Sequence, residues 1–221
     1  MRIKNYDSFV VFVDDDALVL DHHPYRDRHL ILAVLTRGSG VQRGVLRRAR
    51  GGKTPPAAAA QILSVVHLSL VQRPHAELAT FENLELVTSS YTLARDLRRS
   101  AAGAVVAELL LTFCPPAEPA ERAFRLGVAA LEALLTGLDT DLVIAYTEYW
   151  LLTLGGVLPP PENAPTPLTN REKAFLTICR SHPLAEIGTA VPSAICGWLD
   201  RLVREEAERP LRALTFLRRY T

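Results

Sequence analysis

The sequence has few cysteines, and they lie far apart, at Cys114, Cys179 and Cys196. No two of them have the Cys-x-x-Cys spacing of a zinc site, and their number and separation do not indicate a disulfide framework. We therefore expect small, buried thiols in a reducing environment. The sequence indicates no metal site and no other cofactor.

Long hydrophobic runs are lacking as well. The apolar run at residues 9–13 is too short for the core of a signal peptide, and the run from Asp14 to Asp16 ends it. Residues 101–113 form the most apolar long stretch, but they contain Glu108 and are too few to span a bilayer. We expect a soluble, cytoplasmic protein that contacts no membrane.

Net charge is low, at +1, but it is unevenly distributed. Residues 17–80 contain nine basic and three acidic side chains, whereas residues 81–221 contain fourteen basic and seventeen acidic ones. Within residues 24–53 a single acid, Asp27, opposes eight basic residues. These are Arg26, Arg28, Arg37, Arg43, Arg47, Arg48, Arg50 and Lys53.

Within this stretch the basic residues alternate with apolar runs at residues 30–35 and 45–46. Because the apolar runs need burial, the pattern indicates strands and turns with charged outer surfaces. A positive field of this kind attracts the phosphates of a nucleic acid. A solvated basic hairpin without a partner is the alternative. Aromatic residues make up only 7% of the chain, and Tyr25 is the one ring in this stretch. We therefore expect salt-sensitive binding through phosphates, with little readout of bases.

The front third of the chain has the alternating pattern of β-strands. Strands are predicted at residues 17–20, 29–35, 41–48, 65–71 and 78–87. Gly38-Ser39-Gly40 makes a tight connection between the second and third. Five short strands of this kind favour a small closed or nearly closed barrel. Residues 1–16 are expected to form an arm or an additional strand.

The spacing of apolar residues becomes helical after residue 88. Helices are predicted at residues 92–113, 119–136, 140–154 and 193–208, and the capping box from Thr169 to Glu172 begins another. The expected fold class is therefore α+β with two domains. A β-barrel domain at residues 1–83 precedes an all-α domain at residues 84–221, with the boundary between residues 83 and 91.

Three local patterns resemble ligand sites but lack what the chemistry requires. Gly52-Lys53-Thr54 resembles the end of a phosphate-binding loop, but Arg47 stands where the first glycine is needed. His22 and His23 are adjacent, so on a strand they point to opposite faces and cannot readily share an ion. The aspartates at residues 14–16 are expected to form a solvated turn. We expect no enzyme, with an unrecognised catalytic site as the rival interpretation.

Two groups of arginines mark the first two predicted helices. Such faces are usually only solvated, but they can instead grip an acidic peptide beside an apolar groove. The residues are Arg95, Arg98 and Arg99 on the first helix, and Arg122 and Arg125 on the second.

Three blocks of sequence follow one another in a particular order and spacing. The first block is residues 17–20 followed by residues 23–37, which include a Pro24-Tyr25 turn. The second is the basic segment 44–53, and the third consists of the rear segments 124–135, 148–156 and 198–214. Together these blocks resemble the RecO family of DNA repair and recombination proteins. The resemblance implies an N-terminal OB-fold barrel and a C-terminal helical domain.

The resemblance also implies a non-enzymatic, nucleoid-associated role as a recombination mediator. It implies binding to single- and double-stranded DNA and annealing of complementary strands. It further implies action with RecR to load RecA onto DNA coated by single-strand-binding protein, whose acidic C-terminal tail is contacted. The alternative is an interaction scaffold that has lost DNA binding.

One departure from the family concerns zinc. Many members carry a four-cysteine zinc site after the third helix, but residues 156–167 contain no cysteine here. We therefore expect no zinc, and we expect the rigid prolines of this connection to restrain it in place of the metal.

Overall fold

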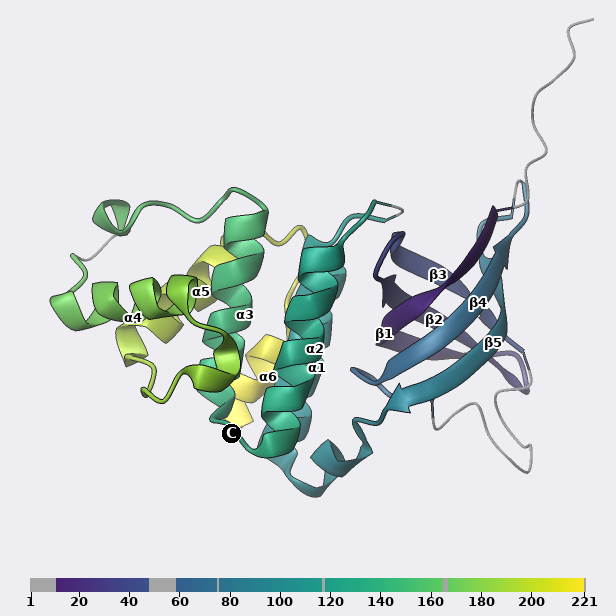
Figure 1. The fold of residues 1–221 in the computed structure, drawn as a ribbon, viewed down its shortest axis with the longest axis horizontal. Helices are drawn as coiled ribbons and strands as arrows, with labels where there is room; N and C mark the ends of the chain where they lie inside the picture. The colour runs from purple at the N-terminus through teal and green to yellow at the C-terminus, as the bar shows by residue number, and fades with distance from the viewer. Residues whose placement is uncertain (1–10, 48–58, 75, 117, 165–166, 221) are drawn as a thin grey trace, which may run out of the picture.

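The structure is a computed structural model that describes residues 11–47, 59–74, 76–116, 118–164 and 167–220. A β-barrel lies at one end of the molecule and a group of helices at the other (Figure 1). The strands are β1 (Val11–Tyr25), β2 (His29–Thr36), β3 (Gly40–Leu46), β4 (Val65–Gln72) and β5 (Ala79–Thr88). They close in the order β1-β2-β3-β5-β4, which gives the five-stranded barrel of an OB-fold.

The first strand is longer than the sequence pattern predicted. Its front half pairs with β4 and its rear half with β2, and a bulge between Val19 and Asp21 lets it curl from one neighbour to the other. The expected solvated turn at residues 14–16 is therefore wrong, because Asp14 and Asp16 lie within β1, opposite β4. The last strand, β5, ends at Thr88, one residue after the predicted end at residue 87.

Alternation along the strands fills the barrel with aliphatic side chains. Leu32, Leu68 and Leu70 are fully buried there and belong to one cluster with Phe81 of β5. The residues between them on each strand point outward, as the pleat requires. The outer faces of the strands are therefore the surfaces available to partners or to the helices.

The rear of the chain is helical, as predicted. Its elements are η2 (Tyr91–Arg95), α1 (Leu97–Phe113), α2 (Glu121–Thr136), α3 (Thr140–Leu154), η3 (Pro161–Asn163), α4 (Asn170–Ser181), η4 (Leu184–Glu186), α5 (Ser193–Glu206) and α6 (Arg212–Tyr220). The capping box of Thr169 and Glu172 begins α4, and Gly137 in the left-handed conformation ends α2. Among the described residues, no helix is long and apolar enough to cross a membrane.

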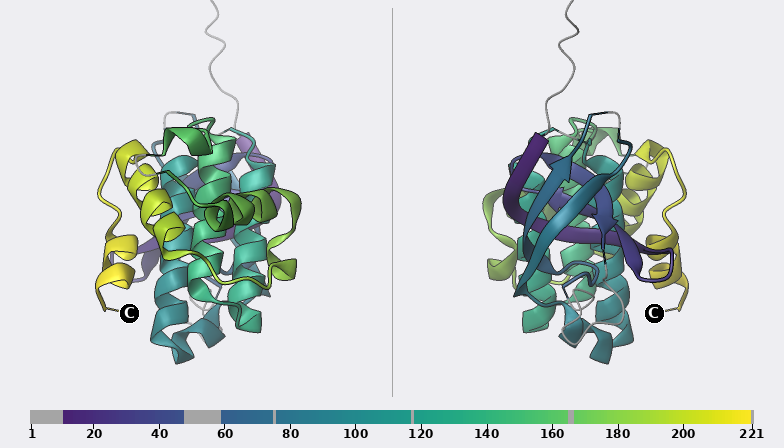
Figure 2. Two further views of the ribbon diagram at one scale, coloured as in Figure 1. Left: turned by 90° about the vertical axis from the view of Figure 1, so that its left-hand side faces the viewer. Right: turned by 90° about the vertical axis from the view of Figure 1, so that its right-hand side faces the viewer.

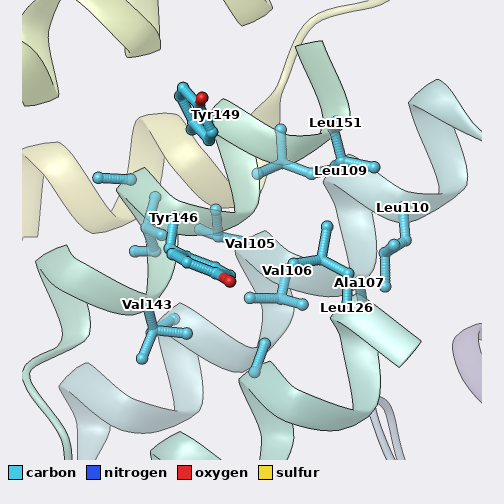
Figure 3. Close-up of a cluster of buried hydrophobic side chains, with 14 of the residues drawn as sticks. Val105, Val106, Ala107, Leu109, Leu110, Leu126, Val143, Tyr146, Tyr149 and Leu151 are labelled. Atoms are coloured by element: carbon cyan, nitrogen blue, oxygen red, sulfur yellow. The ribbon is translucent and has the colours of Figure 1, made fainter. Parts of the chain in front are cut away.

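The helical core forms around α1 and α3. Figure 3 shows Val105 and Val106 of α1 beside Tyr146 of α3, with Leu126 of α2 nearby. Both central helices bury residues on most of their faces, because α2, α5 and α6 pack around them. The two end-on views show this layer from opposite sides, with the smaller helices nearest the viewer on the left and the barrel strands nearest the viewer on the right (Figure 2).

The barrel and the helices share one hydrophobic core. Leu18, Leu35 and Val41 lie on the outer face of the barrel, yet they belong to the same buried cluster as α1, α2 and α3. Gly127 of α2 allows a close approach, because a Cβ there would lie 2.5 Å from Leu18 Cδ1. This packing fixes the barrel against α1 and α2, so the orientation of its free faces is set by the fold.

Candidate nucleic-acid interface

The outer surface of β1, β2 and β3 forms one continuous face beyond the part that the helices cover. Cross-strand pairs place His23 beside Ile31 and Ile31 beside Val45. The next row brings Asp21, Ala33 and Arg43 together in the same way. We call this surface the β1–β2–β3 face; it includes the turn between β1 and β2.

Four of the expected DNA-binding arginines gather on this face. Arg26 and Arg28 lie in the turn between β1 and β2, and Arg47 directly follows β3 at the same end, since Leu46 pairs with Leu30. Arg43 lies midway along β3 with its side chain outward. All four are exposed, and none forms an ion pair with an acid in the described part of the chain.

The turn that carries Arg26 has a strained backbone. Arg26 adopts a left-handed conformation, with φ at 52°, and its guanidinium lies 5.2 Å from the ring centre of Tyr25. A non-glycine residue in this region costs roughly 1 kcal/mol, which the packing around the turn must offset. The conformation presents the guanidinium on the one aromatic ring of the basic stretch.

Arg37 lies apart from the other arginines. It follows β2, whose eight residues separate it from Arg28 by about 30 Å along the strand. Its Nη2 atom lies 2.9 Å from Oε1 of Glu121 in α2, and this hydrogen bond raises the pKa of Arg37 and lowers that of Glu121. The structure thus gives Arg37 a contact between barrel and helices. The expected site residues Arg48, Arg50 and Lys53 lie outside the described residues.

The opposite side of the barrel is acidic. His67 of β4 lies between two carboxylates of β1, with Nδ1 3.0 Å from Asp16 and Nε2 3.1 Å from Asp14. The hydrogen bond to Asp16 is the largest cause of a raised His67 pKa, and the charge of Asp14 adds to it. Glu85 of β5 is the cross-strand neighbour of His67. The barrel is therefore polarised, with phosphates attracted to the β1–β2–β3 face and repelled from this one.

The spacing of Asp14 and Asp16 is the one feature of the sequence that could have indicated this acidic surface. Two residues apart on a strand, they share a face. The arrangement was not predicted because the run of three aspartates was interpreted as a turn.

No group of three His, Cys, Asp or Glu side chains within the described ranges is arranged to hold a metal ion. The thiols of Cys114 and Cys179 are buried, which raises the pKa of each to about 12.

The arginines expected to grip an acidic peptide fall into two separate places. Arg98 donates from Nε to Thr140 Oγ1 at 2.9 Å and from Nη2 to Asp141 at 2.8 Å, so it ties α1 to the start of α3. Arg99 pairs with Asp96, the cap of its own helix, and lies against Gly137 at the end of α2. Arg95 is exposed at the end of η2.

Arg122 and Arg125 lie at the opposite end of α2, whose 16 residues span about 24 Å. Both are exposed and line a groove of about 600 Å³. The other lining residues are Leu126, Ala129, Tyr146, Trp150, Leu154, Pro183 and Leu184. The groove thus combines an apolar floor with two cations at its rim. Arg98 and Arg99, in contrast, contact residues at the ends of helices.

Comparison with known families matches both parts of the chain. Residues 11–90 match the family model described as "Recombination protein O N terminal", and residues 94–163 match "Recombination protein O C terminal". The chain belongs to the RecO family. The first RecO match ends just before η2 and the second begins within it, at the junction of the barrel with the helices.

Curated relatives carry the same family name. The chain is 28% identical over 144 residues to the DNA repair protein RecO of Koribacter versatilis, covering 65% of this chain and 59% of the relative. It is 33% identical over 153 residues to the RecO of Cupriavidus metallidurans, with 69% of this chain and 50% of the relative covered. The RecO of Cupriavidus pinatubonensis gives 34% identity over 153 residues, or 51% of its length. The matches thus span between half and three fifths of these relatives.

Proposed function

We propose that this chain is a non-enzymatic recombination mediator in DNA repair, which binds DNA through its phosphates on the β1–β2–β3 face. The observation that carries the proposal is the gathering of Arg26, Arg28, Arg43 and Arg47 on one face, without ion pairs to described acids. OB-folds use the face of strands 2 and 3 and the adjoining loops to bind oligonucleotides. Membership of the RecO family supports the same role.

The mechanism is electrostatic. Arginines on a rigid barrel neutralise phosphates of single- or double-stranded DNA and release counterions. With the charge of both strands screened, complementary strands approach and anneal. Tyr25 offers one ring for stacking, so binding depends little on base identity. In the cell this activity serves the loading of RecA, together with RecR, onto DNA coated by single-strand-binding protein.

The groove beside Arg122 and Arg125 suits the acidic tail of single-strand-binding protein. An apolar peptide side chain fits against Tyr146 and Leu184, while the two guanidinium groups at the rim pair with acidic residues. The proposal for this tail therefore keeps Arg122 and Arg125 and assigns Arg98 and Arg99 to the support of helix ends.

The DNA-binding proposal is tested with two variants that remove positive charge. Arg43→Ala combined with Arg47→Ala should weaken binding to a labelled single strand by roughly tenfold at low salt, for all base compositions alike. Arg37→Ala is the matched control, because Arg37 already pairs with Glu121, and it should bind as the unaltered protein does. Fluorescence anisotropy measures both. Equal affinity of the double variant and the control would overturn the proposal and favour a scaffold that does not bind DNA.

The tail-binding proposal has its own pair of variants. Arg125→Ala should weaken binding of a labelled acidic peptide that ends in an apolar residue by several-fold, because a charge-assisted contact is lost. Arg95→Ala removes an exposed arginine remote from the groove and should leave peptide affinity unchanged. Calorimetric titration of the full chain provides the comparison. A larger loss in Arg95→Ala than in Arg125→Ala would place the tail elsewhere.

A further inference from the structure

A cleft lies between the barrel and the C-terminal segment. It is walled by β1 on one side, by α1 at its base, and on the other side by the residues that lead into α6. Its volume is about 450 Å³. The polar side chains that line it are Asp21, His23, Glu108, Arg209 and Arg212.

The two acids of this cleft already have partners. Glu108 accepts hydrogen bonds from the backbone N–H groups of Arg212 at 2.6 Å and of Ala213 at 3.0 Å, so its charge caps the start of α6. The carboxylate of Asp21 accepts a hydrogen bond from the backbone N–H of His22 at 2.8 Å, and it lies 2.9 Å from Nε2 of His23. Both acids therefore already have hydrogen-bond partners within the chain.

The two arginines, in contrast, keep their charge available. Arg209 donates from Nε and Nη2 to the hydroxyl of Thr112, at 3.3 and 3.2 Å, which orients the guanidinium without neutralising it. Arg212 uses only its backbone N–H in the contact with Glu108, and its side chain is exposed. Within the part of the chain that the structure describes, neither guanidinium forms an ion pair.

The cleft is continuous with the β1–β2–β3 face. Asp21, which lines it, pairs with Ala33, and Ala33 pairs with Arg43 on the other side. Neighbouring strands lie about 4.8 Å apart, so the backbones of Asp21 and Arg43 are separated by about 10 Å. An anionic chain that crosses β3, β2 and β1 therefore arrives at the cleft next.

We propose that a DNA strand bound on the β1–β2–β3 face continues over β1 into this cleft, where Arg209 and Arg212 hold its phosphates. The proposal rests on the proposed DNA-binding function and extends it to the C-terminal segment. It makes the binding site longer than the barrel alone and gives the helical part a direct role in holding DNA. A long strand engages both places, whereas a short one is held by the barrel.

The test compares single strands of two lengths, about 6 and about 20 nucleotides, of which the first lies within and the second beyond the range of about 4 to 16 nucleotides known for one OB-fold. Arg209→Ala combined with Arg212→Ala should leave affinity for the short strand unchanged. Affinity for the long strand should fall roughly tenfold, and the slope of log affinity against log salt should become shallower by about 1 to 2. The matched control is Arg171→Ala with Arg180→Ala on α4, which lies at the far end of the molecule from the barrel (Figure 1).

A second variant guards against a loss of stability through the contact between Arg209 and Thr112. Arg212→Ala alone keeps every side-chain hydrogen bond described around the cleft and should give about half of the change in log affinity for the long strand. Long-strand affinity equal to that of the α4 control, in both the double and the single variant, would overturn the extension. That outcome differs from failure of the proposed function, in which Arg43→Ala with Arg47→Ala leaves the affinity for both lengths unchanged.

Discussion

A single buried carboxyl group, that of Glu148, bears most directly on stability at the scale of residues. Glu148 lies in α3 with no exposed surface, and neither carboxyl oxygen has a hydrogen-bond partner among the described residues. Burial raises its pKa well above the usual value, and the nearby carboxylate of Asp200 raises it further. Asp200 itself is held by Arg218 of α6, at 2.8 and 2.9 Å. An ionised Glu148 would therefore be costly here.

Replacing Glu148 with Gln should stabilise the protein near neutral pH. A carboxyl whose pKa is raised on folding favours the folded state below its unfolded pKa and loses that contribution as pH rises through the folded pKa. Each unit by which folding raises the pKa costs about 1.4 kcal/mol of folding free energy at pH values above the folded pKa. Urea unfolding at pH 7.5 should therefore show Glu148→Gln to be the more stable protein, with the difference closing toward pH 4. A less stable variant at pH 7.5 would contradict this account.

The arginines show what sequence can and cannot predict about single residues. Arg37 and Arg43 lie in the same basic stretch, and nothing local distinguishes them. Their difference comes from Glu121, which lies 84 residues after Arg37 and meets it only because α2 packs against the end of the barrel. The gathering of charge was therefore predictable, but the separation of Arg37 from the rest required the tertiary structure.

At the scale of elements, the turn between β2 and β3 joins the barrel to the helices. Gly40 begins β3 with φ at 63°, and a Cβ there would lie 2.1 Å from the carbonyl oxygen of Glu118. Gly40→Ala should destabilise the protein by about 3 kcal/mol, because both the backbone conformation and the close approach oppose a side chain. Gly188 has no atom within 4 Å of such a Cβ. Gly188→Ala, followed by the same urea unfolding, should change stability by less than about 0.5 kcal/mol, and equal losses in the two variants would refute the role of Gly40.

The ends of helices were predicted correctly where a local sequence signal determines them. The capping box at Thr169 and the glycine at residue 137 each act within a few residues, and both helix ends were predicted. The start of α1 was predicted at residue 92 but lies at Leu97, because Asp96 caps the helix by accepting from the backbone of Arg99. The early start of β1 was missed because its three aspartates are stabilised by cross-strand partners that the local sequence does not reveal.

At the scale of the whole molecule, charge is segregated around a rigid barrel. Acids flank His67 on the side of β1 and β4, whereas arginines without described ion pairs occupy the β1–β2–β3 face. The sequence predicted the barrel, the helical part and the basic stretch. The cleft beside Arg212 was not predictable, because it forms only when α6 returns to α1 and meets Glu108, 104 residues earlier in the chain.

The central claim, that this protein binds DNA through phosphates on one face of the barrel, is tested most directly by a salt series. Anisotropy of a labelled single strand of about 30 nucleotides should give a log affinity that falls linearly with log salt. Four phosphate contacts imply a slope of about −3 or steeper, the same for different base compositions. An affinity that does not change with salt, or no binding at low salt, would contradict the claim.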